Sequence, residues 1–269
     1  MDGGLQVKQL FIIIFIALSF ISCKPSWVRE LESKNPLRDS TQFTSVYFRF
    51  DTIINDFEVS GILYPQYDDF HGWSGYENGV RLFFHSLKTG KEYVWTDWNE
   101  NARCFRNIFM SKNVYDIYFT KGFNGFKDYY VFTYDTTPLP DPNNDLYPNA
   151  EYQFYDVDFD GDLELLINYY HGGPYSCTFY EIFEMTDSTL VSKEPVNTPD
   201  KTWFSLDDNT EFDAVNKTIT NRFYSGCCEW GEFFYRVDEK GDFYEVYIVH
   251  NTSDVNHDII KSDTTYIQD

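Results

Sequence analysis

The chain is patterned as a series of short segments in which aromatic and β-branched residues recur. Within one of them, Val80, Leu82 and Phe84 occupy alternate positions and would share one face of a strand. No long stretch with the 3.6-residue period of a helix interrupts the series. The pattern predicts strands at residues 44–50, 57–63, 79–86, 91–97, 114–120, 127–134, 163–170, 177–184, 217–223, 230–237 and 243–250.

Turn residues divide this series. Gly90 and Gly241 lie in predicted hairpin turns, where glycine accepts the positive φ that a tight turn often requires. Prolines interrupt residues 136–150 and exclude a helix or a central strand there. About a dozen short strands predict a mainly β fold, as an antiparallel sandwich, a barrel or a small propeller-like array. The expected segments are an N-terminal β region (43–135), a linker loop (136–150), a C-terminal β region (151–250) and a polar tail with room for one edge strand (251–269).

The N-terminus indicates export. A lysine precedes an apolar run over residues 10–20, which is short for a membrane span, and Ser22 and Cys23 follow it. This order resembles a bacterial lipoprotein signal, with Phe20 at a position where leucine is usual. The resemblance implies a lipid (palmitate) anchor on Cys23 and a location in the bacterial cell envelope, on its periplasmic face or at the cell surface. Plain secretion is the alternative. The expected segments are a signal peptide (1–22) and a tether (23–42).

Composition narrows the class of partner. The chain has 26 Phe, 22 Tyr and 6 Trp, residues that favour half-buried pleated surfaces. Its 43 Asp and Glu against 21 Lys and Arg give a formal net charge of −22. This charge repels phosphate groups and argues against nucleic acid or anionic lipid as a partner. It would favour association with a basic protein, although it also serves to keep an aromatic-rich β surface soluble.

Four cysteines follow the expected anchor: Cys104, Cys177, Cys227 and Cys228. In an exported protein they allow disulfides in three pairings, which the sequence does not rank, and a bridge from Cys177 to Cys227 or Cys228 is one of the options. No paired C-x-x-C spacing supports a zinc site.

The acidic stretch just past the middle of the chain is the best candidate for a metal site. It places carboxylates at alternate positions and a glycine where the loop must reverse. Hard oxygen donors at this spacing suit Ca²⁺, and a backbone carbonyl at position 162 would add a ligand. The candidate ligands are Asp156, Asp158, Asp160, Asp162 and Glu164.

The loop departs from an EF-hand. Ile167 stands at the twelfth position, where an EF-hand has a bidentate glutamate, and residues 163–170 predict a strand in place of the exiting helix. Crowded carboxylates repel one another, and a divalent cation that they share would neutralise this repulsion and hold them together. We therefore expect structural rather than catalytic calcium, with a solvated acidic turn as the alternative.

Patterns for catalysis are weak. The segment Gly72-Trp73-Ser74-Gly75-Tyr76 lacks the spacing of a nucleophile elbow, and the five histidines are scattered. His171 lies in a glycine-rich stretch after the acidic loop, where a turn histidine is the simpler interpretation. We do not expect an enzyme. An envelope hydrolase stays open as an alternative, because the separation of paired carboxylates depends on the fold.

A cluster of aromatic residues is the candidate contact surface. Tyr67, Phe70, Trp73 and Tyr76 lie in an expected glycine-containing loop, where a rigid strand core would present them to a partner. The alternative is that they fold back over one end of the sheets as a secondary core.

Two resemblances refine these expectations. The acidic loop resembles the D-x-D-x-D-G-x-x-D calcium hairpins of FG-GAP and VCBS repeats, with Glu164 in place of the last aspartate. Residues 154–249 resemble a family of bacterial envelope lipoproteins that includes immunity proteins against lysozyme-like effectors delivered by type IV secretion. That resemblance is carried by the acidic loop, by Lys217-Thr218-Ile219 followed by Ser225-Gly226, and by the hairpin around Gly241. The Cys227-Cys228 pair and the long aromatic first half depart from the family pattern.

The resemblance implies a β-rich, exported and inhibitory protein. The function we expect is a calcium-stabilised envelope lipoprotein with a protein-binding role, as an inhibitor or immunity protein against a peptidoglycan-cleaving enzyme. A surface carbohydrate-binding module that uses aromatic platforms is the second hypothesis, and the hydrolase is the third.

Overall fold

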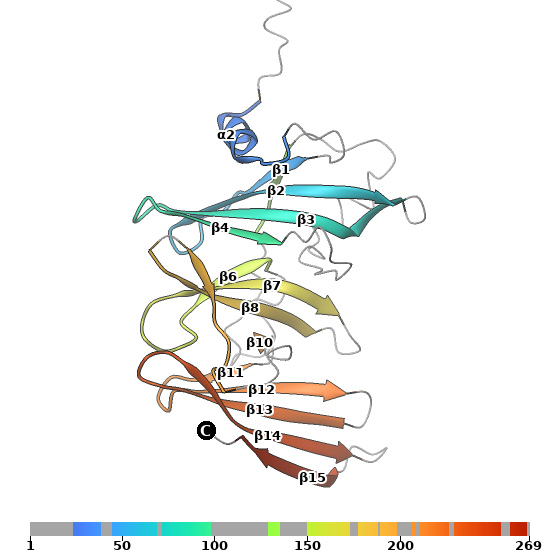
Figure 1. The fold of residues 1–269 in the computed structure, drawn as a ribbon, viewed down its shortest axis with the longest axis vertical. Coiled ribbons are helices and arrows are strands. Elements are labelled where there is room, and N and C mark those ends of the chain that lie inside the picture. Colours follow the sequence, from blue (N-terminus) through green and yellow to red (C-terminus); the bar gives the residue numbers. More distant parts are fainter. Residues whose placement is uncertain are drawn as a thin grey trace, which may run out of the picture.

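The protein is a stack of three β-sheets with a helix at one end, as the computed structural model shows (Figure 1). The structure describes residues 24–38, 45–68, 72–97, 129–134, 150–172, 177–187, 189–197, 206–207, 210–225, 229–253 and 259–267. Within these residues, 15 strands form three five-stranded sheets, which we call sheets A, B and C in chain order. The predicted mainly β class is confirmed, in a sandwich-like form with three layers.

Each sheet is built from strands close together in the sequence. Sheet A contains β1 (Val46–Phe50), β2 (Phe57–Asp68), β3 (Gly72–Ser86), β4 (Glu92–Asp97) and β5 (Tyr129–Phe132), in the order β4-β3-β2-β1-β5. Sheet B contains β6 (Tyr152–Tyr155), β7 (Glu164–Gly172), β8 (Cys177–Met185), β9 (Leu190–Ser192) and β10 (Leu206–Asp207), in the order β10-β8-β7-β6 with β9 also on β8. Sheet C contains β11 (Glu211–Asp213), β12 (Thr218–Ser225), β13 (Glu229–Val237), β14 (Phe243–Ser253) and β15 (Ile259–Tyr266), in that order. Paired strands run antiparallel, except that β1 and β5 are parallel.

Sheet A follows the two-residue period of its sequence. In β1, Phe48 and Phe50 are buried in the core shared with sheet B, whereas Tyr47 lies in a cluster on the opposite face. Aromatic rings fill much of the core between the two sheets. Phe57 of sheet A stacks on Phe154 of sheet B with 4.6 Å between ring centroids. This interface is therefore held mainly by apolar and aromatic packing.

Sheet B is buried on both faces along β7. Leu165 and Ile167 lie in the core shared with sheet A, and Leu166 between them lies in the core shared with sheet C. All three have no exposed surface. A strand covered on both faces needs a continuous apolar run, which explains why these three residues show no alternation.

Helix α2 (Ser26–Lys34) packs on the outer face of sheet A. Val28 and Leu31, three positions apart on one side of the helix, are buried against that face. Asn35 follows the helix and links it to the sheet. Its side-chain amide donates to the Tyr47 hydroxyl at 3.0 Å and accepts from the Tyr64 hydroxyl at 2.9 Å.

The helix corrects the interpretation of residues 23–42 as a tether. Residues 26–34 belong to the folded body. This polar segment has few apolar positions, and they are buried only because the outer face of sheet A provides apolar partners. The sequence pattern by itself was therefore too weak to predict the helix.

Both predicted hairpin turns are present. The turn from β3 to β4 places Gly90 at a φ of 71°, and the turn from β13 to β14 places Gly241 at a φ of 79°. Both values lie in the left-handed region that glycine adopts without strain.

The C-terminal β region is more extensive than predicted. The expected unit at residues 151–250 is divided between sheets B and C, and β15 is an edge strand in the polar tail, where the sequence left room for one. All eight residues of β15 are exposed, and a strand of this kind shows no amphipathic pattern. The sequence missed β6, β9, β10 and β11, which have two to four residues each and are too short for alternation to be recognised.

The aromatic segment expected to be a contact loop is largely extended. Tyr67 lies in β2 opposite Trp73 in β3, and Tyr76 also lies in β3. The expectation of a loop over these residues was therefore wrong, because aromatic residues favour strand pairing over turns despite the glycines nearby. Phe70 lies outside the described residues.

Several other predictions fall outside the described part of the chain. They are the signal peptide with Cys23, the strand at 114–120, nearly all of the linker loop, and Cys104, Cys227 and Cys228. Among the residues that are described, no helix has the length and hydrophobicity needed to cross a membrane.

Candidate metal centre

The acidic loop connects β6 to β7 beside the interface of sheets B and C. Val157 in this loop is buried in the core between the two sheets. The chain reverses through left-handed conformations at Phe159 (φ 61°) and Gly161 (φ 97°). The Asp156 carboxylate accepts hydrogen bonds from the backbone N–H groups of Asp160 and Gly161, each at 3.1 Å. These bonds close the loop and fix the direction of its side chains.

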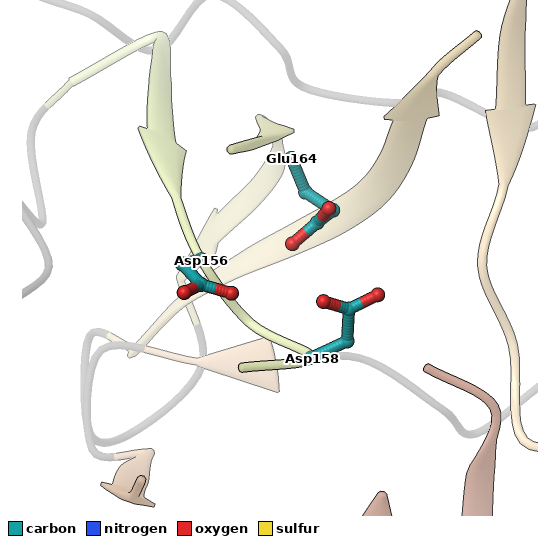
Figure 2. A group of neighbouring side chains, drawn as sticks. All are labelled: Asp156, Asp158 and Glu164. Atoms are coloured by element: carbon teal, nitrogen blue, oxygen red, sulfur yellow. The ribbon is translucent and has the colours of Figure 1, made fainter. Parts of the chain in front are cut away.

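Three of the predicted ligands lie together in space. Asp156, Asp158 and Glu164 each contribute a carboxylate oxygen, and these oxygens lie within 4.8 Å of one another (Figure 2). Calcium binds oxygen ligands at about 2.3–2.6 Å, so oxygens around one ion are separated by up to roughly 5 Å. The donor type and spacing therefore fit one side of a calcium site. Asp160 and Asp162 are exposed and are not part of this group.

Glu164 is held where its charged form is poorly solvated. It begins β7, is 2% exposed, and its Oε2 accepts a hydrogen bond from the Val157 N–H at 2.9 Å. Burial raises the pKa of Glu164 to about 8, and the negative charges of Asp158 and Asp160 add to the rise. The Val157 hydrogen bond and the charge of Lys193 oppose it. A further positive charge here would stabilise the ionised carboxylate.

Lys193 supplies a positive charge to this loop. Its ammonium group forms a short ion pair with Asp158 Oδ2, and the two side chains are 13% and 1% exposed. It also donates to the Gly241 carbonyl at 3.4 Å, lies 4.0 Å from Glu184 Oε2, and stands 5.7 Å from the ring centroid of Phe243. Burial lowers the pKa of Lys193, but the hydrogen bond to Asp158 and the negative charges of Asp158, Glu164 and Glu184 together raise it overall.

Gly241 brings sheet C into contact with the loop of sheet B. A Cβ atom at this position would collide with the Asp158 carboxylate, and the left-handed φ disfavours other residues independently. Both the available space and the backbone conformation therefore favour glycine here. We refer to Asp158, Lys193 and Gly241 together as the Asp158 junction.

The sequence did not indicate Lys193. It lies 35 residues from Asp158, and no local pattern distinguishes it from the other lysines. Gly241 was assigned only a turn, because the approach of Asp158 depends on the stacking of two sheets.

An aromatic row on the outer face of sheet C was also missed. Phe234 stacks on Tyr247 with 4.8 Å between centroids and 2° between ring planes, and Tyr247 contacts Tyr266 edge-on at 6.0 Å. These residues are cross-strand neighbours on β13, β14 and β15. They lie on the face opposite Tyr235, which is buried toward sheet B. Alternation within residues 230–237 could have placed Phe234 on this face. It could not have predicted that Tyr266 of β15 joins the row.

Comparisons with known proteins give little further information. No family model matches the chain, and no curated protein sequence matches it. A distant structural neighbour is a solved structure described as "Structure of a Xanthomonas Type IV Secretion System related protein", with a TM-score of 0.45 and 13% sequence identity over 86% of this chain and 91% of that chain. A similarity of this extent does not identify a shared function.

Proposed function

We propose that this chain is a calcium-stabilised lipoprotein of the bacterial cell envelope that binds a protein partner. The proposed role is that of an inhibitor or immunity protein against a peptidoglycan-cleaving enzyme. The observation that carries the proposal is the convergence of Asp156, Asp158 and Glu164 beside the interface of two sheets.

The surroundings of these carboxylates favour structural calcium. Asp158 and Glu164 are almost completely buried. The loop is closed by its own carboxylate–amide bonds, for example from the Asp160 N–H to Asp156 at 3.1 Å. An ion bound here would join the loop to the start of β7 and neutralise carboxylates that otherwise repel one another. Its effect would therefore be seen in stability.

The calcium proposal is tested by thermal unfolding of the full chain in calcium and in a chelator. We expect a higher melting temperature in calcium, since a ligand at 100 times its Kd stabilises by about 2.7 kcal/mol. Asp158→Ala should lower the melting temperature in calcium and remove the difference between the two conditions. Asp187→Ala, which changes an exposed aspartate outside the loop, should preserve that difference. If the melting temperature of the wild type is the same in calcium and in chelator, stabilisation by calcium is ruled out.

Net charge and a row of aromatic rings on the surface of sheet C support a protein partner. A net charge of −22 would accelerate encounter with a basic protein and make association sensitive to salt. The row of Phe234, Tyr247 and Tyr266 offers aromatic side chains of the kind that dominate binding energy at protein interfaces. A basic peptidoglycan-cleaving enzyme would combine both features in one partner.

Retention of envelope components on the immobilised protein tests this role. We expect salt-sensitive capture of a basic protein, together with loss of muramidase activity when the two are mixed. Recovery of glycan without protein would overturn the inhibitor role.

The aromatic row also favours a second candidate, a surface carbohydrate-binding module. Sugar rings stack on aromatic side chains, and a sheet face with aligned rings can serve as a platform. Under this alternative, Tyr247→Ala should abolish retardation of the protein in gels containing cell-wall glycan. Under the first proposal it should weaken protein capture and leave migration in such gels unchanged.

A further inference from the structure

We infer that Lys193 is a resident counter-charge of the acidic loop that competes with calcium for Asp158, and that this competition sets the affinity of the site for the cation. The inference rests on the proposed calcium site and assigns the regulation of that site to a residue outside the loop.

Both carboxylate oxygens of Asp158 are engaged within the protein. Oδ2 is paired with the Lys193 ammonium, and Oδ1 accepts a hydrogen bond from the Asp160 N–H at 3.2 Å. An ion that binds Oδ2 would displace Lys193, and an ion that binds Oδ1 would compete with Lys193 for the charge of the same carboxylate. The two cations also repel each other in a place where little water is present to screen them.

The structure provides an alternative partner for the displaced lysine. Glu184 Oε2 lies 4.0 Å from the ammonium, and its side chain is 51% exposed, so it faces the solvent side of the junction. A small rotation of the lysine side chain would exchange Asp158 for Glu184. Calcium binding would then break the buried ion pair between Lys193 and Asp158. A more solvated ion pair between Lys193 and Glu184 would replace part of its stabilisation.

The same exchange would couple the cation to the contact between sheets B and C. Lys193 donates to the Gly241 carbonyl in the β13–β14 turn and stands over the Phe243 ring. Moving the ammonium toward Glu184 would weaken both contacts. Lys193 thus links the occupation of the loop in sheet B to the turn of sheet C.

Calcium titration of the full chain by calorimetry tests the inference. We expect Lys193→Met to bind calcium about tenfold more tightly than the wild type, in the range typical of coupled sites. Lys193→Arg retains the charge and should keep the weaker wild-type affinity, which separates charge from side-chain size. Glu184→Gln removes the alternative partner and should weaken binding.

The matched control is Lys91→Met. It removes one positive charge from an exposed ion pair with Asp187, far from the loop in sequence, and should leave the calcium affinity unchanged. This variant accounts for the change in net charge. Circular dichroism of each variant without calcium shows whether it is folded, and Lys193→Gln replaces Lys193→Met where the latter is not.

The outcomes separate the inference from the calcium proposal. Equal affinities for the wild type and the neutral Lys193 variant would overturn the inference and leave the calcium proposal in place. Binding by the neutral variant without binding by the wild type would support the inference and overturn calcium stabilisation of the natural protein. Absence of binding in every variant would overturn both.

Discussion

Two lysine–aspartate ion pairs lie where neighbouring sheets meet, in very different surroundings. Lys91 and Asp187 join turns of sheets A and B at 2.8 Å, with the lysine 41% exposed and the aspartate fully exposed. Lys193 and Asp158 meet beside sheets B and C, where the aspartate is 1% exposed. Water and salt screen the first pair, whereas removing either partner of the second leaves a buried charge. The A–B interface therefore depends on apolar packing, and the B–C interface also depends on charge balance.

The largest effect is expected in the aromatic core between sheets A and B. Phe84 has no exposed surface, and its ring lies 5.4 Å from that of Tyr152 and 6.3 Å from that of Phe154. Phe84→Ala should reduce the free energy of unfolding by about 3–5 kcal/mol. Denaturant titration should give the same loss in calcium and in chelator. A loss of stability that differs between calcium and chelator would show that the A–B interface is not independent of the metal site.

An intermediate effect is expected at the turn of sheet C. Gly241→Ala introduces a residue with a positive φ, which costs about 1–2 kcal/mol, and also forces the new Cβ against Asp158. Gly90→Ala is the matched control, because Gly90 has a similar φ of 71° and a Cβ added there would meet no atom within 4 Å. Gly241→Ala should be the more destabilising of the two by denaturant titration, and it alone should change the calcium response. Equal losses would mean that the Asp158 contact adds nothing.

The smallest effect is expected at the exposed ion pair. Lys91→Met removes the partner of Asp187, but both groups are solvated and few contacts are lost. Differential scanning calorimetry should show no measurable change in melting temperature, with or without calcium. A decrease comparable to that of Gly241→Ala would show that the A–B interface also depends on charge.

The sequence predicted the features that depend on local chemistry. Alternating apolar residues marked most of the long strands, and Gly90 and Gly241 marked two hairpin turns, because one strand face and one left-handed residue suffice for each. Spacing also identified Asp156, Asp158 and Glu164 as neighbours, because all three belong to one short loop and the first residue of the strand that follows it. Whether they hold calcium stays a prediction.

Features that depend on stacking could not be predicted. Val28 and Leu31 become a buried helix face only against sheet A, and Lys193 reaches Asp158 only because β9 is paired onto sheet B. The separation of the C-terminal strands into two layers likewise depends on which face of each strand is covered by the neighbouring sheet.

The double burial of β7 has a consequence for folding fidelity. Leu165, Leu166 and Ile167 are all apolar, so a slip of one residue is opposed only at the ends of this run, where Glu164 or Asn168 would enter the core shared with sheet A. The apolar run by itself is therefore a weak determinant of the alignment. The first pair in the observed alignment is Tyr155 with Glu164, directly flanking the acidic loop, which the Val157–Glu164 hydrogen bond closes. We expect the length and closure of this loop to select the native alignment of β7 with β6. Substitutions that prevent loop closure would then let the two strands pair in the wrong register during folding.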